Sequence, residues 1–275
     1  MPSSGLPHVT PEAALTPEVL RMLEDATGLG DRDSWLGIWF LISKAEQDNE
    51  KVSGTFEIES SKGSLFGYAS ALSYDMKQRG VTIGLVGWTT GNDHKDGAGD
   101  APELFKIYKS LGGDDLMPYV KGCCGSKEKC DVLIKKIHSI ATDPKWIAAQ
   151  WKQLVTNSPD GAYIFHTMAA FKKIGIAKPS ALALSVVLDT SLNQGHDGPD
   201  GGCSHLIKLA TKGNEIKTLE AYIAWKSKVA GTNEYNDPPS NGKARAKMFG
   251  DLLKAKCFDL KSQSALKAAV GWTMK

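Results

Sequence analysis

The sequence predicts a mainly helical α+β protein that contains one small region of β structure. From residue 100 onward, apolar residues recur at helical spacing in one segment after another. Convincing strand patterns occur only in residues 53–90, where turn residues and glycines separate short runs of β-forming residues. With 275 residues, 41% of them hydrophobic, the chain can bury a core as one large domain or as two lobes around a cleft.

Composition and charge exclude several classes of partner. The 33 basic and 31 acidic residues give a formal charge of +2, which does not fit a strongly basic nucleic-acid-binding domain. No apolar run approaches the ~20 residues that span a bilayer. The loop over residues 89–99 does not match a calcium loop, because Lys95 and Gly97 stand where oxygen ligands are required. We therefore expect no nucleic-acid, membrane or metal partner.

The first long helix is expected to be buried and to end in a polar segment. After a short helix at Pro17–Thr27, the pair Asp33-Ser34 indicates the N-cap of a helix over residues 35–48. Its apolar residues cover nearly the whole helix circumference, which is typical of a buried helix. Glu46 follows this apolar part. An acidic residue there is either solvated surface or an acid placed for chemistry.

The β region consists of two predicted parts. Residues 55–59 and 65–70, separated by Ser-Ser-Lys-Gly, predict a hairpin. Residues 81–88, Val-Thr-Ile-Gly-Leu-Val-Gly-Trp, predict a further strand or a strand-like turn, with glycines that allow close approach of the backbone.

The rest of the chain is predicted to be helical. Asp100 caps a helix that runs to Leu111, and Pro102 lies in its first turn. Asp189 lies in a nearly all-apolar helix, where an unpaired carboxylate is costly, so we expect a cationic partner for it. The chain has only four arginines, each a candidate for a buried ion pair. Further helices are expected at residues 130–142, 145–155, 162–172, 180–192, 206–211, 216–230 and 243–255.

The five cysteines are evidence on whether the protein is secreted or cytosolic. They lie at Cys123, Cys124, Cys130, Cys203 and Cys257, and none forms a Cys-x-x-Cys pair of the kind that binds zinc. A loop closed by a disulfide from Cys123 or Cys124 to Cys130 is the more natural interpretation. Two disulfides would suit a secreted protein and five reduced thiols a cytosolic one, and we expect secretion.

Three segments of the chain resemble one family of enzymes. Residues 40–48, Phe-Leu-Ile-Ser-Lys-Ala-Glu-Gln-Asp, resemble the acid-bearing helix end of the family 46 chitosanases. Residues 79–91, Arg-Gly-Val-Thr-Ile-Gly-Leu-Val-Gly-Trp-Thr-Thr-Gly, match a strand segment of that family in spacing and glycine placement. Residues 100–108 are similar to the helix that follows. The chain thus resembles a diverged family member, such as one of a fungal-type branch.

The resemblance implies a fold and an activity. The fold is two-lobed and lysozyme-like, with a small β-sheet beside a substrate cleft. We expect one catalytic domain over residues 1–275, with the β-containing lobe at about residues 50–100. Family members hydrolyse β-1,4 bonds inside chitosan chains with inversion, using two carboxyl groups and no cofactor. The implied partners are chitosan or glucosamine oligosaccharides, bound by a secreted monomer.

The resemblance also assigns roles to residues. Glu46 corresponds to the general acid, and Thr82 to the threonine that helps to hold the attacking water. Asp100 corresponds to a carboxylate that binds a glucosamine ammonium group, and Arg79 to the arginine of the strand segment.

Further residues complete the expected site. Asp189 and Arg245 resemble members of a buried ion network behind the acid. Tyr74 and Asp93 are additional candidates for substrate contacts.

The general base is the point at which the family pattern fails. The family has an aspartate two residues before the arginine, and this chain has Lys77 there. Asp75 lies two residues earlier and is our candidate for the base. Glu57, Glu59 and Asp93 are the alternatives.

Other functions remain open from the sequence. One is a lysozyme-like hydrolase of another glycan, such as chitin or peptidoglycan. Another is a catalytically weak or inactive secreted protein that binds chitosan or chitin oligomers, an alternative motivated by the displaced base.

Overall fold

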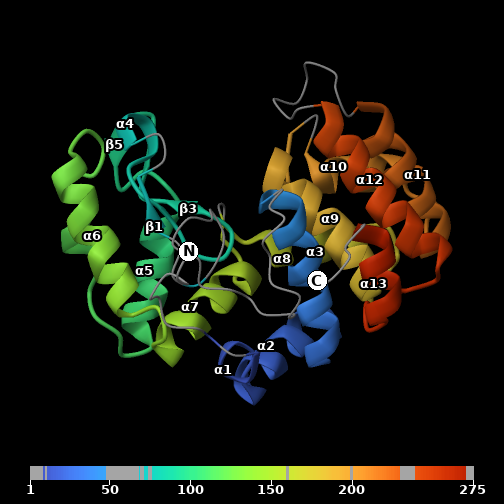
Figure 1. Cartoon of the computed structure of the whole chain (residues 1–275), viewed down its shortest axis with the longest axis horizontal. Helices are drawn as coiled ribbons and strands as arrows, with labels where there is room; N and C mark the ends of the chain where they lie inside the picture. The colour runs from blue at the N-terminus through green and yellow to red at the C-terminus, as the bar shows by residue number, and fades with distance from the viewer. Residues whose placement is uncertain are drawn as a thin grey trace. The chain divides into compact units, whose positions relative to one another are not determined.

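The computed structural model describes residues 9, 11–47, 68, 71–73, 76–158, 161–198, 201–229 and 239–270 (Figure 1). Most of them lie in helices, and the strands are short, so the expected mainly α (α+β) class is confirmed. The chain divides into two compact units: unit 1 comprises residues 1–19 and 57–162, and unit 2 comprises residues 20–56 and 163–275. Among the described residues, no helix has the length and apolar character needed to cross a membrane.

The β structure lies in unit 1. Strands β1 (Ala71–Leu72), β2 (Thr82–Ile83) and β3 (Trp88–Thr89) form an antiparallel sheet in the order β1-β2-β3. Residues 81–88 are therefore two strands joined by a tight turn, because Gly84 and Gly87 both adopt positive φ and reverse the chain. Residues 89–99, expected as a loop, include a second hairpin of β4 (Gly91–Asn92) and β5 (Lys95–Asp96). The hairpin expected at 55–59 and 65–70 lies outside the described residues, apart from Tyr68.

Helices α5 (Ala101–Ser110), α6 (Lys127–Ser139) and α7 (Pro144–Val155) accompany these strands in unit 1. Short helices α1 (Pro11–Ala14), α4 (Met76–Arg79) and η1 (Met117–Tyr119) were not expected from the sequence. The core of the unit is aromatic. Tyr68 accepts hydrogen bonds from the indoles of Trp146, at its carbonyl oxygen (2.8 Å), and of Trp151, at its hydroxyl (2.7 Å). All three side chains are fully buried.

A buried glutamine on α7 holds the turn between β2 and β3. Gln150 Oε1 accepts a hydrogen bond from the backbone N–H of Leu85 (2.8 Å). Gly84 precedes Leu85, and a Cβ atom on it would lie 2.7 Å from Gln150 Oε1 and 2.8 Å from the ring of Trp88. The turn therefore requires glycine for its positive φ and for this close approach.

We expect Gly84→Ala to lower the free energy of unfolding of the protein more than Gly97→Ala does. Both glycines have φ between +70° and +80°, the left-handed region that costs an L-residue about 1–2 kcal/mol. Among the described residues, no atom lies within 4 Å of a Cβ built on Gly97, so that variant measures the backbone cost alone. Urea denaturation of both variants gives the difference, which should be about 1–3 kcal/mol for the overpacked site. Equal losses would contradict the close packing described above.

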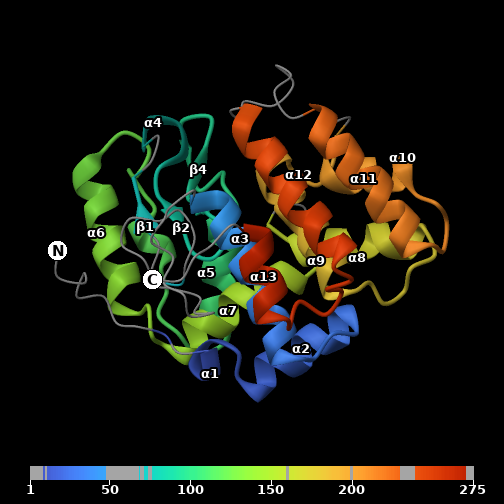
Figure 2. The same cartoon turned by 45° about the vertical axis from the view of Figure 1, so that its right-hand side comes forward.

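Unit 2 is helical in its described residues. It contains α3 (Arg32–Gln47), α8 (Tyr163–Lys173), α9 (Ala181–Gln194), α10 (Gly202–Leu209), α11 (Glu215–Val229), α12 (Pro239–Lys254) and α13 (Gln263–Val270); α2 (Pro17–Thr27) begins in unit 1. Helix α3 packs against α9, and α11 lies alongside α12 (Figures 1 and 2). Helix α13 was not expected from the sequence.

The buried helix expected from residue 35 begins earlier, at Arg32. Asp31 Oδ1 accepts a hydrogen bond from Ser34 N (2.9 Å), so Asp31 performs the capping that the sequence analysis assigned to Asp33-Ser34. The expectation of burial is confirmed, because Trp35, Ile38 and Ile42 are fully buried.

The expected disulfide from Cys123 or Cys124 to Cys130 is wrong for this structure, since all five cysteines are free thiols. The Cys130 thiol donates to the carbonyl oxygen of Cys123 (3.0 Å), and the Cys123 thiol donates to that of Tyr119 (3.3 Å). Burial raises the pKa of Cys123 to about 12 and that of Cys124 to about 11, which disfavours their reactive thiolate forms.

Candidate active site

The strand segment of unit 1 links two of the predicted residues. Thr82 is buried in β2 and pairs with Thr89 of β3. The backbone N–H of Thr89 donates to Asp100 Oδ1 (2.6 Å), and Asp100 itself is the N-cap residue of α5. One strand residue thus links the predicted water-holding threonine to the predicted ammonium-binding carboxylate.

Contacts of Gly80 and Thr90 hold the start of β2 in place. Val81 N donates to Thr90 Oγ1 (2.9 Å), and Thr90 N donates to the carbonyl oxygen of Val81 (3.0 Å). Gly80 ends α4 with φ +71°, and a Cβ atom there would lie 2.4 Å from Thr90 Oγ1. Arg79, the last residue of α4, is exposed beside this rigid turn.

Asp93 and Asp96 of the second hairpin differ in their hydrogen bonding. Asp93 is exposed in the turn between β4 and β5, where both Asp93 and His94 adopt positive φ. Asp96 accepts hydrogen bonds from the backbone N–H groups of Gly122 (2.5 Å) and Cys124 (2.7 Å). Asp96 therefore anchors the turn before α6, while the side chain of Asp93 is accessible to solvent and solutes.

Three predicted residues are not placed by the structure. Tyr74 and Asp75 lie outside the described residues, as do the alternative bases Glu57 and Glu59. Glu46 is the penultimate residue of α3, so the structure gives its position on the helix, but its side chain lies outside the described part.

In unit 2, the buried Asp189 of α9 meets two cations. Its Oδ1 lies 3.1 Å from Arg245 Nη1, and its Oδ2 lies 3.0 Å from Lys226 Nζ. Lys226 Nζ also donates to Thr190 Oγ1 (3.0 Å). Asp189 is fully buried, and the two cationic side chains are nearly so. We call Asp189, Lys226 and Arg245 the ion cluster; it joins α9, α11 and α12.

The ion cluster keeps its carboxylate charged. Burial alone raises the pKa of Asp189, but the charges and hydrogen bonds of Lys226 and Arg245 outweigh burial and hold the pKa below its usual value. The structure therefore supplies the cationic partner that an aspartate in an apolar helix requires.

Lys226 was missed by the sequence analysis. The missed signal is its spacing: Lys226 follows Leu219 by seven residues and Tyr222 by four, on the apolar face of α11. A lysine on such a face needs a buried anion, and Asp189 was the buried carboxylate for which the sequence predicted a cationic partner.

We expect Asp189→Asn to lower the free energy of unfolding by about 3–5 kcal/mol at neutral pH, because it removes the carboxylate that neutralises two buried cations. Asp251→Asn is the matched control. Asp251 also pairs with two lysines, Lys247 and Lys254, but at the surface, where such pairs contribute at most about 1 kcal/mol. Urea denaturation measures both variants. A loss for Asp189→Asn no larger than the control's would contradict this role.

The same comparison has a pH signature. A carboxyl whose pKa is lower in the folded than in the unfolded state stabilises the protein above its unfolded pKa of about 4, and this contribution disappears as the pH falls through the folded value. The difference in unfolding free energy between the native protein and Asp189→Asn should therefore shrink below about pH 4. A constant difference down to pH 2 would be inconsistent with the lowered pKa.

Comparison with solved structures identifies the fold. The fold is similar to that of a family 46 chitosanase from Gynuella sunshinyii, solved with chitotetraose, with a TM-score of 0.57 and 20% identity over 83% of this chain and 91% of the other. It is also similar to the native chitosanase of Bacillus subtilis MY002, with a TM-score of 0.56 and 20% identity over 84% of this chain and 92% of the other. The chain therefore has the lysozyme-like fold of these two proteins.

A closer relative gives the family. The chain is 30% identical over 282 residues to a chitosanase from Niallia circulans, covering 97% of this chain and 86% of the relative. No protein-family model matches the chain. The protein belongs to the chitosanase family, and the resemblance to family 46 stated from the sequence is confirmed.

Proposed function

We propose that the protein is an endo-acting chitosanase, which hydrolyses the β-1,4-glycosidic bonds of chitosan with inversion at the anomeric carbon. The observation that carries this function is the 30% identity to the Niallia circulans chitosanase over 97% of the chain. In an inverting hydrolase, one carboxylic acid protonates the leaving oxygen and one carboxylate activates a water on the opposite face of the sugar.

Glu46 is our candidate for the acid and Thr82 for the residue that helps to hold the water. The position of Glu46 in the last turn of α3 supports its role, because the buried helix anchors the backbone from which the side chain extends. The pairing of Thr82 with Thr89 supports the second assignment, because it fixes Thr82 next to the strand that holds Asp100.

Carboxylates suit a substrate that carries ammonium groups. We assign Asp100 and Asp93 to this recognition and Arg79 and Tyr74 to neighbouring substrate contacts. Asp93 is exposed, and Asp100 is half-buried with one oxygen fixed by Thr89. A cationic polymer is attracted to such groups, and the attraction weakens as salt is added.

The experiment that tests the function compares substrates. Chitosan and N-acetylated chitin are incubated with the protein, and viscosity and new reducing ends are measured. An endo-acting chitosanase lowers the viscosity of chitosan before many reducing ends appear, and it leaves chitin largely intact. Proton NMR of the first products then gives the anomeric configuration. Cleavage of chitin or peptidoglycan instead of chitosan would favour the lysozyme-like alternative.

The displaced base favours a second candidate function, a chitosan-binding protein with little or no turnover. Lys77, the residue at the family's base position, is exposed on α4 and cannot act as a carboxylate base. This alternative predicts retention on immobilised glucosamine oligomers without new reducing ends. Turnover of chitosan by the purified protein eliminates it.

We further propose that the enzyme is monomeric and works outside the cell. The second part rests on the polymeric substrate, since the free cysteines remove the argument from disulfides. Size-exclusion chromatography with light scattering tests the first part, and assay of culture fluid against cell extract tests the second.

A further inference from the structure

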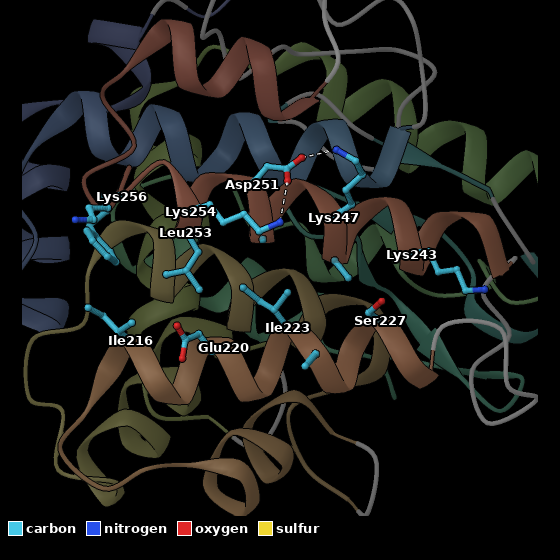
Figure 3. Close-up of a pocket in the computed structure, with 14 residues that line it drawn as sticks. Ile216, Glu220, Ile223, Ser227, Lys243, Lys247, Asp251, Leu253, Lys254 and Lys256 are labelled. Carbon is cyan, nitrogen blue, oxygen red and sulfur yellow. Dashed lines mark hydrogen bonds and ion pairs between the residues drawn. The ribbon is translucent and has the colours of Figure 1, made fainter.

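A groove between α11 and α12 has no role in the proposed reaction. It has a volume of about 790 Å³ and is lined by side chains of both helices and by Lys256 and Phe258 just after α12 (Figure 3). Small residues at four lining positions leave the space open: Ala224, Ser227, Ala246 and Gly250. Larger apolar residues flank them: Ile216, Ile223, Leu253 and Phe258.

Lysines dominate the polar part of the groove. Four of them line it, against the two carboxylates Glu220 and Asp251. Asp251 is already paired with Lys247 and Lys254, as Figure 3 shows. Within the described part of the chain, no ion-pair partner is found for Lys243 or Lys256, which lie toward opposite ends of the groove (Figure 3).

This charge pattern excludes chitosan as the occupant. A polymer of glucosamine ammonium groups is repelled by a groove with an excess of lysines. The complementary occupant is anionic, and the apolar flanks require that it also offer aliphatic surface. Because cationic groups stand toward both ends rather than at one end, a ligand with a single anionic head is a poorer match than one with charges along its length.

The spacing of the lining residues indicates a helical occupant. Lys243, Lys247, Gly250 and Lys254 follow one another at intervals of three or four residues and form one stripe on α12, about 16 Å long at 1.5 Å per residue. Ile216, Glu220, Ile223 and Ser227 form the matching stripe on α11. A groove between two adjacent helices matches the shape of an amphipathic helix, whose apolar face packs into such grooves.

We propose that the groove between α11 and α12 is a docking site for an acidic amphipathic helix of a partner protein. The helix would place its apolar face against Ile223, Leu253 and Phe258 and its carboxylates against the lysines. Glu220, on the opposite wall, would favour a basic residue in the bound helix and so give it a direction. This inference does not depend on the proposed chitosanase activity.

Binding of synthetic peptides to the full-length protein tests the proposal. The probe is a fluorescein-labelled 18-residue peptide with leucines at helical spacing on one face and glutamates on the other, and binding is followed by fluorescence anisotropy. One control peptide has lysine in place of every glutamate, and another has the acidic sequence scrambled. We expect the acidic amphipathic peptide to bind at least about tenfold more tightly than either control and to weaken as salt rises.

Two variants and one control separate the contribution of charge to binding from that of shape. Lys243→Glu/Lys256→Glu should weaken peptide binding at least about tenfold, while Lys172→Glu/Lys173→Glu, the same charge change on the exposed end of α8, should leave it unchanged. Gly250→Met places a longer side chain in the hollow, and among the described residues its Cβ atom meets only Ile223 Cγ2, at an ordinary contact distance of 3.7 Å. It should weaken binding while the thermal midpoint holds or rises, because glycine is unfavourable inside a helix. Chitosan hydrolysis should be unchanged in all three variants.

Several results would overturn the proposal. Equal binding of the acidic and basic peptides, or unchanged binding by Lys243→Glu/Lys256→Glu, would show that the groove does not select an acidic helix. Binding of dodecanoate or of phosphatidylserine-containing vesicles without binding of the peptide would assign the groove to a lipid. Self-association that Gly250→Met abolishes, without peptide binding, would assign it to a second copy of the chain.

Discussion

Glu46→Gln should reduce chitosan hydrolysis by at least about a hundredfold, because a positioned general acid contributes typically 10²–10⁴-fold to the rate. Glutamine keeps the size and hydrogen-bonding capacity of the side chain but cannot give a proton to the leaving oxygen. Since apolar residues such as Trp35, Ile38 and Ile42 bury α3, the thermal midpoint should hardly change. Reducing-end assays with chitosan, together with a thermal scan, make both measurements.

The matched control for this substitution is Glu18→Gln, an exposed glutamate in α2. It should keep the activity of the native protein. The pH profile gives a readout specific to an acid: the residual activity of Glu46→Gln should lose the decline at high pH that deprotonation of the acid causes. If Glu46→Gln retains activity within tenfold of the control, Glu46 is not the acid.

Asp75→Asn should abolish turnover while leaving the binding of glucosamine oligomers in place. The water that attacks the anomeric carbon needs a carboxylate to take its proton, and an amide cannot do this. The expected loss is again about 10²–10⁴-fold. Reducing-end assays measure turnover, and calorimetric titration with a glucosamine oligomer measures binding.

The controls for this prediction include variants of the alternative candidate bases. Asp93→Asn, Glu57→Gln and Glu59→Gln are assayed in parallel, and Asp114→Asn, at an exposed ion pair with Lys136, serves as the neutral reference. For a base, the residual activity of Asp75→Asn should lose the decline at low pH, the opposite limb from Glu46→Gln. Near-normal turnover by Asp75→Asn, with a large loss in one rival variant, would reassign the base to that residue.

Local signals account for the parts of the fold that could be predicted. Pro102 and the aspartate before it predicted the start of α5. The apolar helix expected at 180–192 is observed as the buried α9. By contrast, α13 has a short and weakly marked pattern, and α4 is a single turn held by its neighbours, so neither has a strong signal of its own.

In the candidate site, too, local motifs predict some residues, while others depend on how the helices pack. Glu46 and Thr82 are predicted by motif, because they stand within contiguous segments that resemble the family. The ion cluster could be predicted only in part. The apolar surroundings of Asp189 indicated a cationic partner, and the family resemblance named Arg245, but Lys226 of α11, 37 residues further along the chain, was not predicted. Such long-range pairing depends on how the helices pack, which the spacing within one helix does not reveal.

The lowered pKa of Asp189 has a consequence for the conditions in which the enzyme can work. Chitosan is a soluble polycation only when its amines are protonated, so its hydrolysis belongs to mildly acidic solution. Without the two cations, burial would raise the pKa of this carboxyl and so favour its neutral form. By holding the pKa of Asp189 below its usual value, Lys226 and Arg245 keep this buried carboxylate ionised in the same solution.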